Sequence, residues 1–236
     1  MLNTHSPVML NEVESYIPLN KKINVIDATF GGGGYSKKIL EKFKVNKLIG
    51  IDRDSIANIF AKELKKKYSN FTFLKGCFSN IDELIFDNIS KEIKFDAIIF
   101  DLGLSSNQLN AKERGFSFLN EGPLDMCMGE NEINASEIVN NYTEEKIANI
   151  IFKYGEEQLS RRIAKNIIFA RKTKLIKNTK ELVDIIKKSF PISKINKSKS
   201  HIATKTFQAL RIFVNNELNE ISLALNKSIN LLAPKG

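Results

Sequence analysis

The sequence predicts an α/β fold with a parallel sheet, and three observations support this prediction. Residues 23–52 run in the order apolar strand, glycine loop, helix and apolar strand, which is the order of a βαβ unit. Apolar strands and amphipathic helices then alternate as far as about residue 108. From residue 109 the alternation stops and helical patterns follow one another. We therefore expect an α/β part followed by a helical part.

The βαβ unit has the layout of a nucleotide site. A short helix is expected within residues 5–18, and the first strand, Ile23–Ile26, then ends at Asp27. The glycines Gly31–Gly34 follow, and glycine lets the backbone turn tightly and approach a ligand, since it reaches positive φ and has no Cβ. Asp52 ends the second strand, about 20 residues after the loop, where an acid can bind both hydroxyls of a ribose. This order favours a ligand site over a plain glycine turn.

The glycine spacing differs from the dinucleotide fingerprint G-x-G-x-x-G, because Ser36 or Lys37 stands at the third glycine position. That glycine allows close helix–strand packing in NAD- and FAD-binding folds, so an NAD enzyme is the weaker alternative. Ser36 is instead suited to cap the helix after the loop. The loop resembles the S-adenosylmethionine loop of Rossmann-like methyltransferases, in which the acid binds the ribose.

A third strand ends beside the same expected edge of the sheet. Residues 71–74 form a short apolar run that leads to the turn Gly76–Ser79. In a parallel sheet this turn falls on the carboxyl edge with the glycine loop, where ligands bind. Phe78 can therefore stack on an adenine ring, although a core position is an equal alternative.

A fourth strand, residues 95–101, ends at Asp101. This is the third acid at a strand end, after Asp27 and Asp52. Three carboxylates on one sheet edge are costly unless ligand groups or hydrogen bonds satisfy them. We interpret the acids as part of a site, although such residues also cap helices.

The second half of the chain is predicted to be helical. Residues 110–130 form a long irregular loop, which in a compact chain is usually functional. Three helices follow, and Thr143 and Thr179 are suited to cap the first and the third. Residues 193–200 form a basic polar linker, and residues 204–232 carry the longest helical pattern, as one helix or a pair. The second helix carries basic residues that either face RNA or form an ordinary solvated surface: Arg161, Arg162, Lys165, Arg171 and Lys172.

Composition narrows the class of protein. The chain has 236 residues, 42% of them hydrophobic, which is enough for a real core. The net charge of +9 favours a polyanionic partner such as nucleic acid. No apolar run approaches the roughly 18 to 20 residues of a membrane span, and the N-terminus has no secretory pattern. The two cysteines form neither a disulfide framework nor a metal-binding spacing, and they suit a reducing cytoplasm. With only two histidines, a histidine-based metal site is not expected.

The chain resembles the small-subunit ribosomal RNA methyltransferase H family from His5 to its C-terminus. The combination of RGFSF, GPLDM and FQALR is very specific, whereas the glycine loop alone is not. The full set of matching motifs is HSPVML, DATFGGGGYS, IGIDRD, DLGLSSNQL, RGFSF, GPLDM, YGEE and TFQALRIFVNNEL.

The resemblance implies a Rossmann-like S-adenosylmethionine-dependent methyltransferase fold with an inserted helical domain. The expected division is residues 1–108 for the first part of the methyltransferase domain, 109–200 for the insertion and 201–236 for its continuation. The implied reaction is methyl transfer from S-adenosylmethionine to N4 of a cytidine in 16S ribosomal RNA of the small subunit, in the cytoplasm. The cofactor contacts fall on Gly33, Gly34, Tyr35, Asp52, Phe78, Asp101 and Gln108.

The expected chemistry needs a hydrogen-bond acceptor near the target amine. The N4 lone pair of cytosine is delocalised into the ring, so the amine is a weak nucleophile that must be held in line with the methyl group. Asp101, or Ser105 and Ser106, are the candidate acceptors. The target base must be unstacked to react, and no metal is required.

The chain also departs from the family pattern. Tyr35 stands where the family usually has histidine, Cys127 replaces an arginine, and Ile202 replaces a proline. The family continues beyond the final Pro-Lys-Gly turn into a further strand, so we expect the last strands of the sheet to be missing. The alternative function is a truncated, non-catalytic remnant that binds RNA or cofactor.

Overall fold

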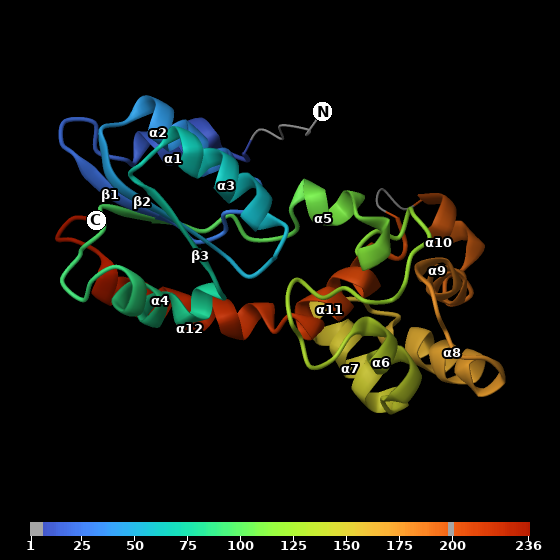
Figure 1. Ribbon diagram of the computed structural model, residues 1–236. Helices are drawn as coiled ribbons and strands as arrows, with labels where there is room; N and C mark the ends of the chain where they lie inside the picture. Colours follow the sequence, from blue (N-terminus) through green and yellow to red (C-terminus); the bar gives the residue numbers. More distant parts are fainter. Residues whose placement is uncertain (1–6, 198–200) are drawn as a thin grey trace. The chain divides into compact units, whose positions relative to one another are not determined.

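The computed structural model describes residues 7–197 and 201–236, which form two compact units (Figure 1). Unit 1 comprises the chain up to Asn107 together with Leu218–Gly236, and unit 2 comprises Gln108–Glu217. His5 and Ser6, at the start of the first expected helix, lie outside the described residues. No helix of the described residues is long and apolar enough to cross a membrane.

Unit 1 is built on a parallel four-stranded sheet with the order β3-β2-β1-β4. The chain adds β2 and β3 on one side of β1 and then crosses to place β4 on the other side. The strand order therefore reverses beside β1, and such a switch point is where open α/β sheets bind ligands. The strands are β1 (Ile23–Asp27), β2 (Val45–Asp52), β3 (Phe71–Lys75) and β4 (Ala97–Ile99).

Helices cover both faces of this sheet (Figure 1). Successive residues of a strand point to opposite faces, so Val25 and Leu48 belong to one core cluster and Ile26 and Ile49 to the other. The first face is covered by α1 (Leu10–Ser15), α2 (Gly34–Lys42) and α3 (Ala57–Lys67). The second is covered by α4 (Ile81–Asn88) and α12 (Glu217–Leu231). The predicted Rossmann-like α/β fold is confirmed.

The fourth strand is shorter than the sequence pattern indicates. Only Ala97–Ile99 pair with β1 as a strand, whereas the apolar run spans residues 95–101. Phe95 instead forms an isolated parallel bridge with Leu232 and is fully buried. The apolar character of Phe95 therefore reflects its burial, and not a continuation of β4 along β1.

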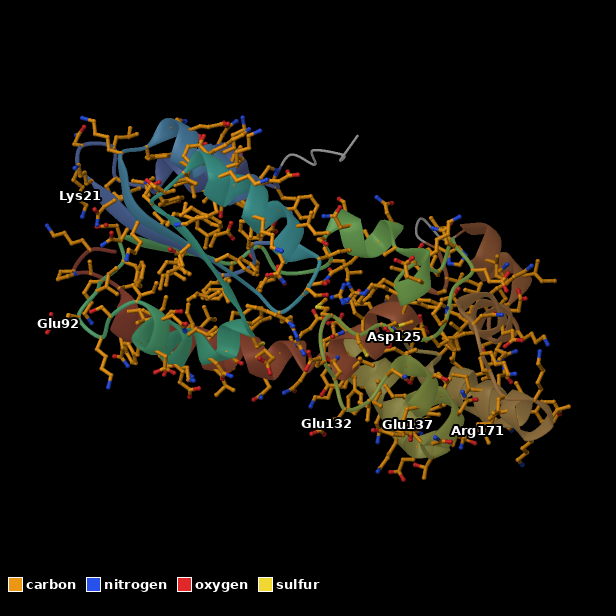
Figure 2. All side chains as sticks on the ribbon, in the orientation of Figure 1. Lys21, Glu92, Asp125, Glu132, Glu137 and Arg171 are labelled. Carbon is orange, nitrogen blue, oxygen red and sulfur yellow. The ribbon has the colours of Figure 1, made fainter. Side chains whose placement is uncertain are left out.

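Unit 2 is helical. Its elements follow α5 (Ser106–Asn110), which crosses the boundary between the units. They are η2 (Lys112–Arg114), α6 (Ala135–Asn141), α7 (Glu144–Gly155), α8 (Ser160–Thr173), α9 (Thr179–Lys187), α10 (Ile192–Lys197) and α11 (Thr204–Val214). Figure 2 labels Asp125 before α6, Glu137 on α6 and Arg171 on α8.

Two local predictions in unit 2 are corrected. Asn178, and not Thr179, caps α9, because its side chain accepts from Glu181 N. Thr179 is buried, and its hydroxyl bonds to Asn120 O and Gly122 N. Residues 193–197 of the expected linker belong to α10, while its residues 198–200 lie outside the described residues. The pattern over residues 204–232 forms a helix pair.

The second expected boundary also differs from the compact units. Helix α11 packs with unit 2, whereas the sequence division placed residues 201–236 in the methyltransferase domain. A Cβ added at Gly155 of α7 would lie 2.4 Å from Lys205 O and 3.1 Å from Ala209 Cβ. Glycine at this position therefore lets α7 and α11 approach closely.

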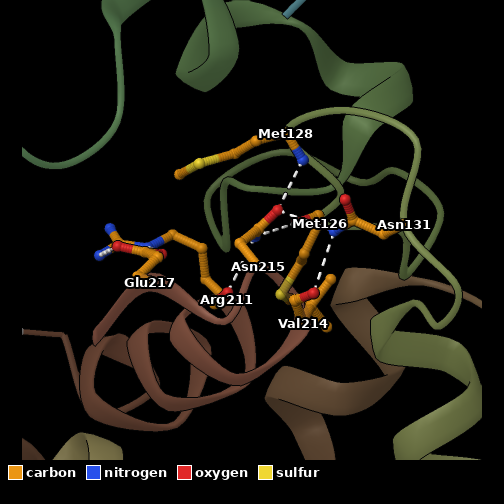
Figure 3. A network of polar contacts seen from close by, with 7 residues as sticks. All are labelled: Met126, Met128, Asn131, Arg211, Val214, Asn215 and Glu217. Carbon is orange, nitrogen blue, oxygen red and sulfur yellow. Dashed lines mark hydrogen bonds and ion pairs between the residues drawn. The ribbon is translucent and has the colours of Figure 1, made fainter. Parts of the chain in front are cut away.

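Two family motifs meet around Asn215 (Figure 3). Its side chain is 2% exposed, accepts from Met128 N at 2.7 Å and donates to Met126 O at 2.8 Å. The amide of Asn131 also donates to it, at 2.9 Å. Met126 adopts a positive φ of 62°. The end of the irregular loop is therefore fixed to the C-terminus of α11 by one buried amide group.

Candidate cofactor site

Asp27 lies beneath the glycine loop, at the end of β1. Its side chain is 1% exposed, and Oδ2 accepts from Ser36 Oγ at 2.6 Å and from Ser36 N at 3.2 Å. Oδ1 has no hydrogen-bond partner among the described residues. Burial raises the pKa of Asp27 to about 6, against the opposing effect of the bonds from Ser36. A buried acceptor without a partner is a group that a bound donor can satisfy.

Ser36 has a different role from the predicted one. Helix α2 begins at Gly34, and its N-cap is Gly33, which has a φ of 76° and offers no side-chain cap. Ser36 is the third residue of the helix, within its first turn, and bonds to Asp27. The prediction of a serine N-cap was therefore wrong, because the partner of Ser36 is a carboxylate nine residues earlier and not a local backbone group.

Asp52 fixes the start of the glycine loop to the end of β2. Its Oδ2 accepts from Gly31 N at 2.6 Å, and its Oδ1 accepts from Asp54 N at 2.8 Å. Burial raises the pKa of Asp52, and the two backbone donors oppose that rise. Because each carboxylate oxygen accepts more than one hydrogen bond, Asp52 keeps capacity for a ligand hydroxyl.

Phe30 supports the loop from below, and sequence reasoning missed it. A Cβ at Gly33 would lie 2.8 Å from Phe30 Cζ, and one at Gly50 would lie 2.6 Å from its ring. The ring stacks on Phe71 with centroids 5.4 Å apart. Nothing in the local pattern distinguishes Phe30, since its contacts come from β2 and β3, but two glycines facing one ring explain why neither position has a side chain.

Tyr35 is buried, and its hydroxyl donates to Val8 O. This bond attaches the N-terminal segment to α2. Burial raises the pKa of Tyr35, and the charge of Asp101 adds to the rise. The predicted cofactor contact of Tyr35 stays a prediction.

The segment after β4 lies against the glycine loop. Asp101 N donates to Thr29 Oγ1 at 2.7 Å, and the residue as a whole is exposed. A Cβ at Gly31 would be 3.8 Å from Ser105 Cβ. Ser106 begins α5 and is half-buried. The structure thus brings Asp101 and Ser105 close to the loop.

Two further predicted cofactor residues lie in short helices. Phe78 is half-buried in a short 3-10 helix, η1 (Phe78–Asn80), and meets Phe100 edge-on with ring centroids 5.8 Å apart. It therefore packs against the core and keeps an exposed part. Gln108 is buried in α5 and is the first residue of unit 2, so its cofactor contact stays a prediction from the resemblance.

Comparison with known proteins identifies the family of this chain. The model of the MraW methylase family matches residues 3–236. The chain belongs to the MraW methylase family. This membership confirms the family resemblance that the motifs predicted.

Its relatives are named ribosomal RNA small subunit methyltransferase H. The one from Mesoplasma florum is 44% identical over 100% of this chain and 75% of its own length. Those from Orientia tsutsugamushi and Caldicellulosiruptor saccharolyticus are 43% and 45% identical, over 100% and 98% of this chain and 75% of their own lengths. An rRNA methylase structure from Streptococcus thermophilus matches with a TM-score of 0.33 and 18% identity, over 52% of this chain and 71% of that one.

Proposed function

We propose that this methylase transfers a methyl group from S-adenosylmethionine to N4 of a cytidine in 16S ribosomal RNA of the small subunit, in the cytoplasm. The observation that carries the proposal is the buried Asp27–Ser36 pair below a glycine loop that Asp52 fixes to β2. Asp27 ends β1, beside which the strand order reverses, and Asp52 ends the neighbouring strand β2. The family membership and the names of the relatives support the reaction and its RNA substrate.

The residues present fit S-adenosylmethionine. The glycines leave a surface without side chains, on which Gly33 and Gly34 can approach the methionine part. Asp52 can accept from the ribose hydroxyls, and the exposed part of Phe78 can contact adenine. Asp27 Oδ1 is an open acceptor below the loop. When bound, the cofactor supplies a methyl group on a positively charged sulfur.

The chain then has to position the target amine. Asp101 is exposed in the segment that follows β4, and its backbone bond to Thr29 fixes this segment beside the loop. Its carboxylate can accept a hydrogen bond from N4 and so favour the developing sp³ nitrogen. Ser105 and Ser106 are the alternative acceptors on the same segment. In this proposal residues 109–200 are an insertion that binds the RNA.

Calorimetry tests the cofactor site. S-adenosylmethionine is titrated into the full chain and into Asp52→Ala, with Asp87→Ala on the exposed surface of α4 as a control that removes the same charge. We expect saturable binding for the chain and the control and none for Asp52→Ala. Heat from NADH instead of S-adenosylmethionine would favour the dinucleotide alternative and contradict the proposal.

Turnover on isolated small subunits tests the reaction, with N4-methylcytidine measured by mass spectrometry of the digested RNA. Asp101→Asn should lower turnover by about 100-fold or more while RNA affinity stays within a factor of two or so. Equal losses in turnover and affinity would contradict a catalytic role for Asp101. Binding of both cofactor and RNA without any methylation by the unaltered chain would establish the non-catalytic alternative.

A further inference from the structure

Helix α8 and the residues after it carry an unusual run of charge. Residues 158–180 contain eight lysines and arginines and no acidic residue. Ordinary solvated helices mix acids and bases, because pairs three or four residues apart stabilise them. The nearest acids along the chain are Glu157 and Glu181. Of these two, Glu181 forms an ion pair with the run, through Lys174.

Four lysines and arginines of α8 lie on one exposed face of the helix. We call this face the α8 stripe and define it as Arg161, Arg162, Lys165, Phe169 and Lys172. Its members are exposed and recur at helical spacing over about 16 Å of helix. None of its four cations forms an ion pair within the part of the chain that the structure describes. Arg171 differs, since it donates to Val139 O at 2.9 Å.

Phe169 is the second, independent feature of the stripe. It is 76% exposed, although it lies in a helix whose other face is well packed. The apolar residues Ile163, Ala164 and Ile167 of α8 are fully buried in unit 2. An aromatic ring surrounded by unpaired cations is the combination with which proteins bind unpaired nucleic acid, since cations contact phosphates and rings stack on bases.

We propose that the α8 stripe binds an unpaired segment of RNA, with Phe169 stacked on a base and the cations on the flanking phosphates. The class of partner rests on the proposed function. An anionic membrane surface is the weaker partner, because an interfacial helix needs a broad exposed apolar face and α8 buries its own. The single exposed ring of Phe169 is enough to stack on one RNA base.

Fluorescence anisotropy with a labelled 20-nucleotide single-stranded RNA tests the cations. The variant combines Arg161→Ala, Lys165→Ala and Lys172→Ala. The matched control combines Lys62→Ala, Lys66→Ala and Lys67→Ala, which removes three exposed charges from α3. The stripe variant should bind at least about tenfold more weakly, and its salt slope should fall by about 2, since each lost phosphate contact removes about 0.7. Equal losses in the control would mean that only net charge matters and would overturn the proposal.

A second series tests the ring. Phe169→Ala should weaken binding by about 5- to 150-fold, the range for one lost base stack. Phe169→Tyr should retain affinity, while Phe169→Leu should lose most of it. Phe152→Ala on α7, where the ring is 62% exposed, is the control. Equal affinity of the Leu variant and the unaltered chain would refute stacking.

Three measurements separate RNA binding by the stripe from misfolding, from membrane binding and from a failure of the cofactor site. All substituted side chains are exposed, so the thermal transition of each variant should match that of the unaltered chain. Binding to vesicles of phosphatidylserine and phosphatidylcholine that depends on the stripe, without RNA binding, would establish the membrane alternative. S-adenosylmethionine affinity should be unchanged in the stripe variants. If the unaltered chain binds RNA through the α8 stripe but binds no cofactor, the proposed methyl transfer is contradicted, whereas RNA binding by the stripe is supported.

Discussion

Replacing Asp27 with asparagine should remove a pH-dependent loss of stability. Burial raises the pKa of Asp27 from 3.8 to about 6, so the folded protein binds this proton more tightly than the unfolded chain does. Stability therefore falls as the pH rises from 3.8 to about 6, and the loss is complete above that window. One pKa unit corresponds to about 1.36 kcal/mol, so the full loss is about 3 kcal/mol.

The asparagine variant cannot ionise, but it keeps an oxygen for the two donors of Ser36. Its amide NH₂ group takes the place of Oδ1, which has no partner among the described residues. This unpaired donor costs about 1–3 kcal/mol at every pH. The change of stability with pH, and not its absolute value, is therefore the diagnostic quantity.

Urea unfolding of the cofactor-free protein at intervals between about pH 3 and pH 8 measures this change. The free energy of unfolding of Asp27→Asn, relative to that of the unaltered chain, should rise by about 3 kcal/mol across the window. The control Asp87→Asn, on the exposed surface of α4, should show no such rise. Parallel curves for Asp27→Asn and the unaltered chain would refute the reasoning.

Three further substitutions test other contacts. Gly115→Ala should destabilise unit 2 by roughly 3–5 kcal/mol in urea unfolding, because φ is 65° and the new Cβ would lie 1.7 Å from Pro123 O. Asn215→Leu should cost roughly 2–5 kcal/mol and speed hydrogen exchange at Met128, whose N–H loses its acceptor. Tyr35→Phe should cost about 1 kcal/mol and speed proteolysis of the N-terminal segment, since the hydroxyl that holds it is gone.

Each of these three substitutions has a control or an outcome that would contradict the expected result. Gly103 also has a positive φ, of 134°, but no atom lies within 4 Å of an added Cβ, so Gly103→Ala should cost only its backbone strain, about 1–3 kcal/mol. An equal cost at both glycines would show that the close contact is unimportant. Unchanged exchange at Met128 would contradict the role of Asn215. Unchanged proteolysis in Tyr35→Phe would show that the segment is held by other contacts.

The ends of β1 and β2 were predictable because their signals are local. An apolar run followed by Asp27 or Asp52 identifies a buried strand and the edge where it ends, and the glycines between them identify the loop. Long-range contacts were not predictable in the same way. The pattern that suggested Ser36 as an N-cap does not reveal that its hydroxyl bonds to Asp27 across the loop.

The same limit applies to unit 2. Asn215 and the loop end at Met126–Asn131 are more than 80 residues apart in the sequence, and neither pattern indicates the other. Phe30 likewise follows no periodic pattern, and its importance comes from glycines on other elements. The family motifs identified these stretches, but only the fold explains what each residue contacts.

Unit 1 is formed by two segments that are separated in the sequence by unit 2, and this has a consequence during synthesis. Helix α12 covers one face of the sheet, and Leu231 is buried against Ile26 and Ile49, yet about 110 residues of unit 2 are translated before this helix. At roughly 5–20 residues per second, the delay is about 5–20 s. Throughout it, α4 is the only one of the two helices that can cover this apolar face of the nascent sheet, so the part that belongs to α12 stays exposed at the ribosome. Unit 2 is continuous in sequence and can finish folding first, so the strand layer that is made earliest is among the last parts of the protein to be completed.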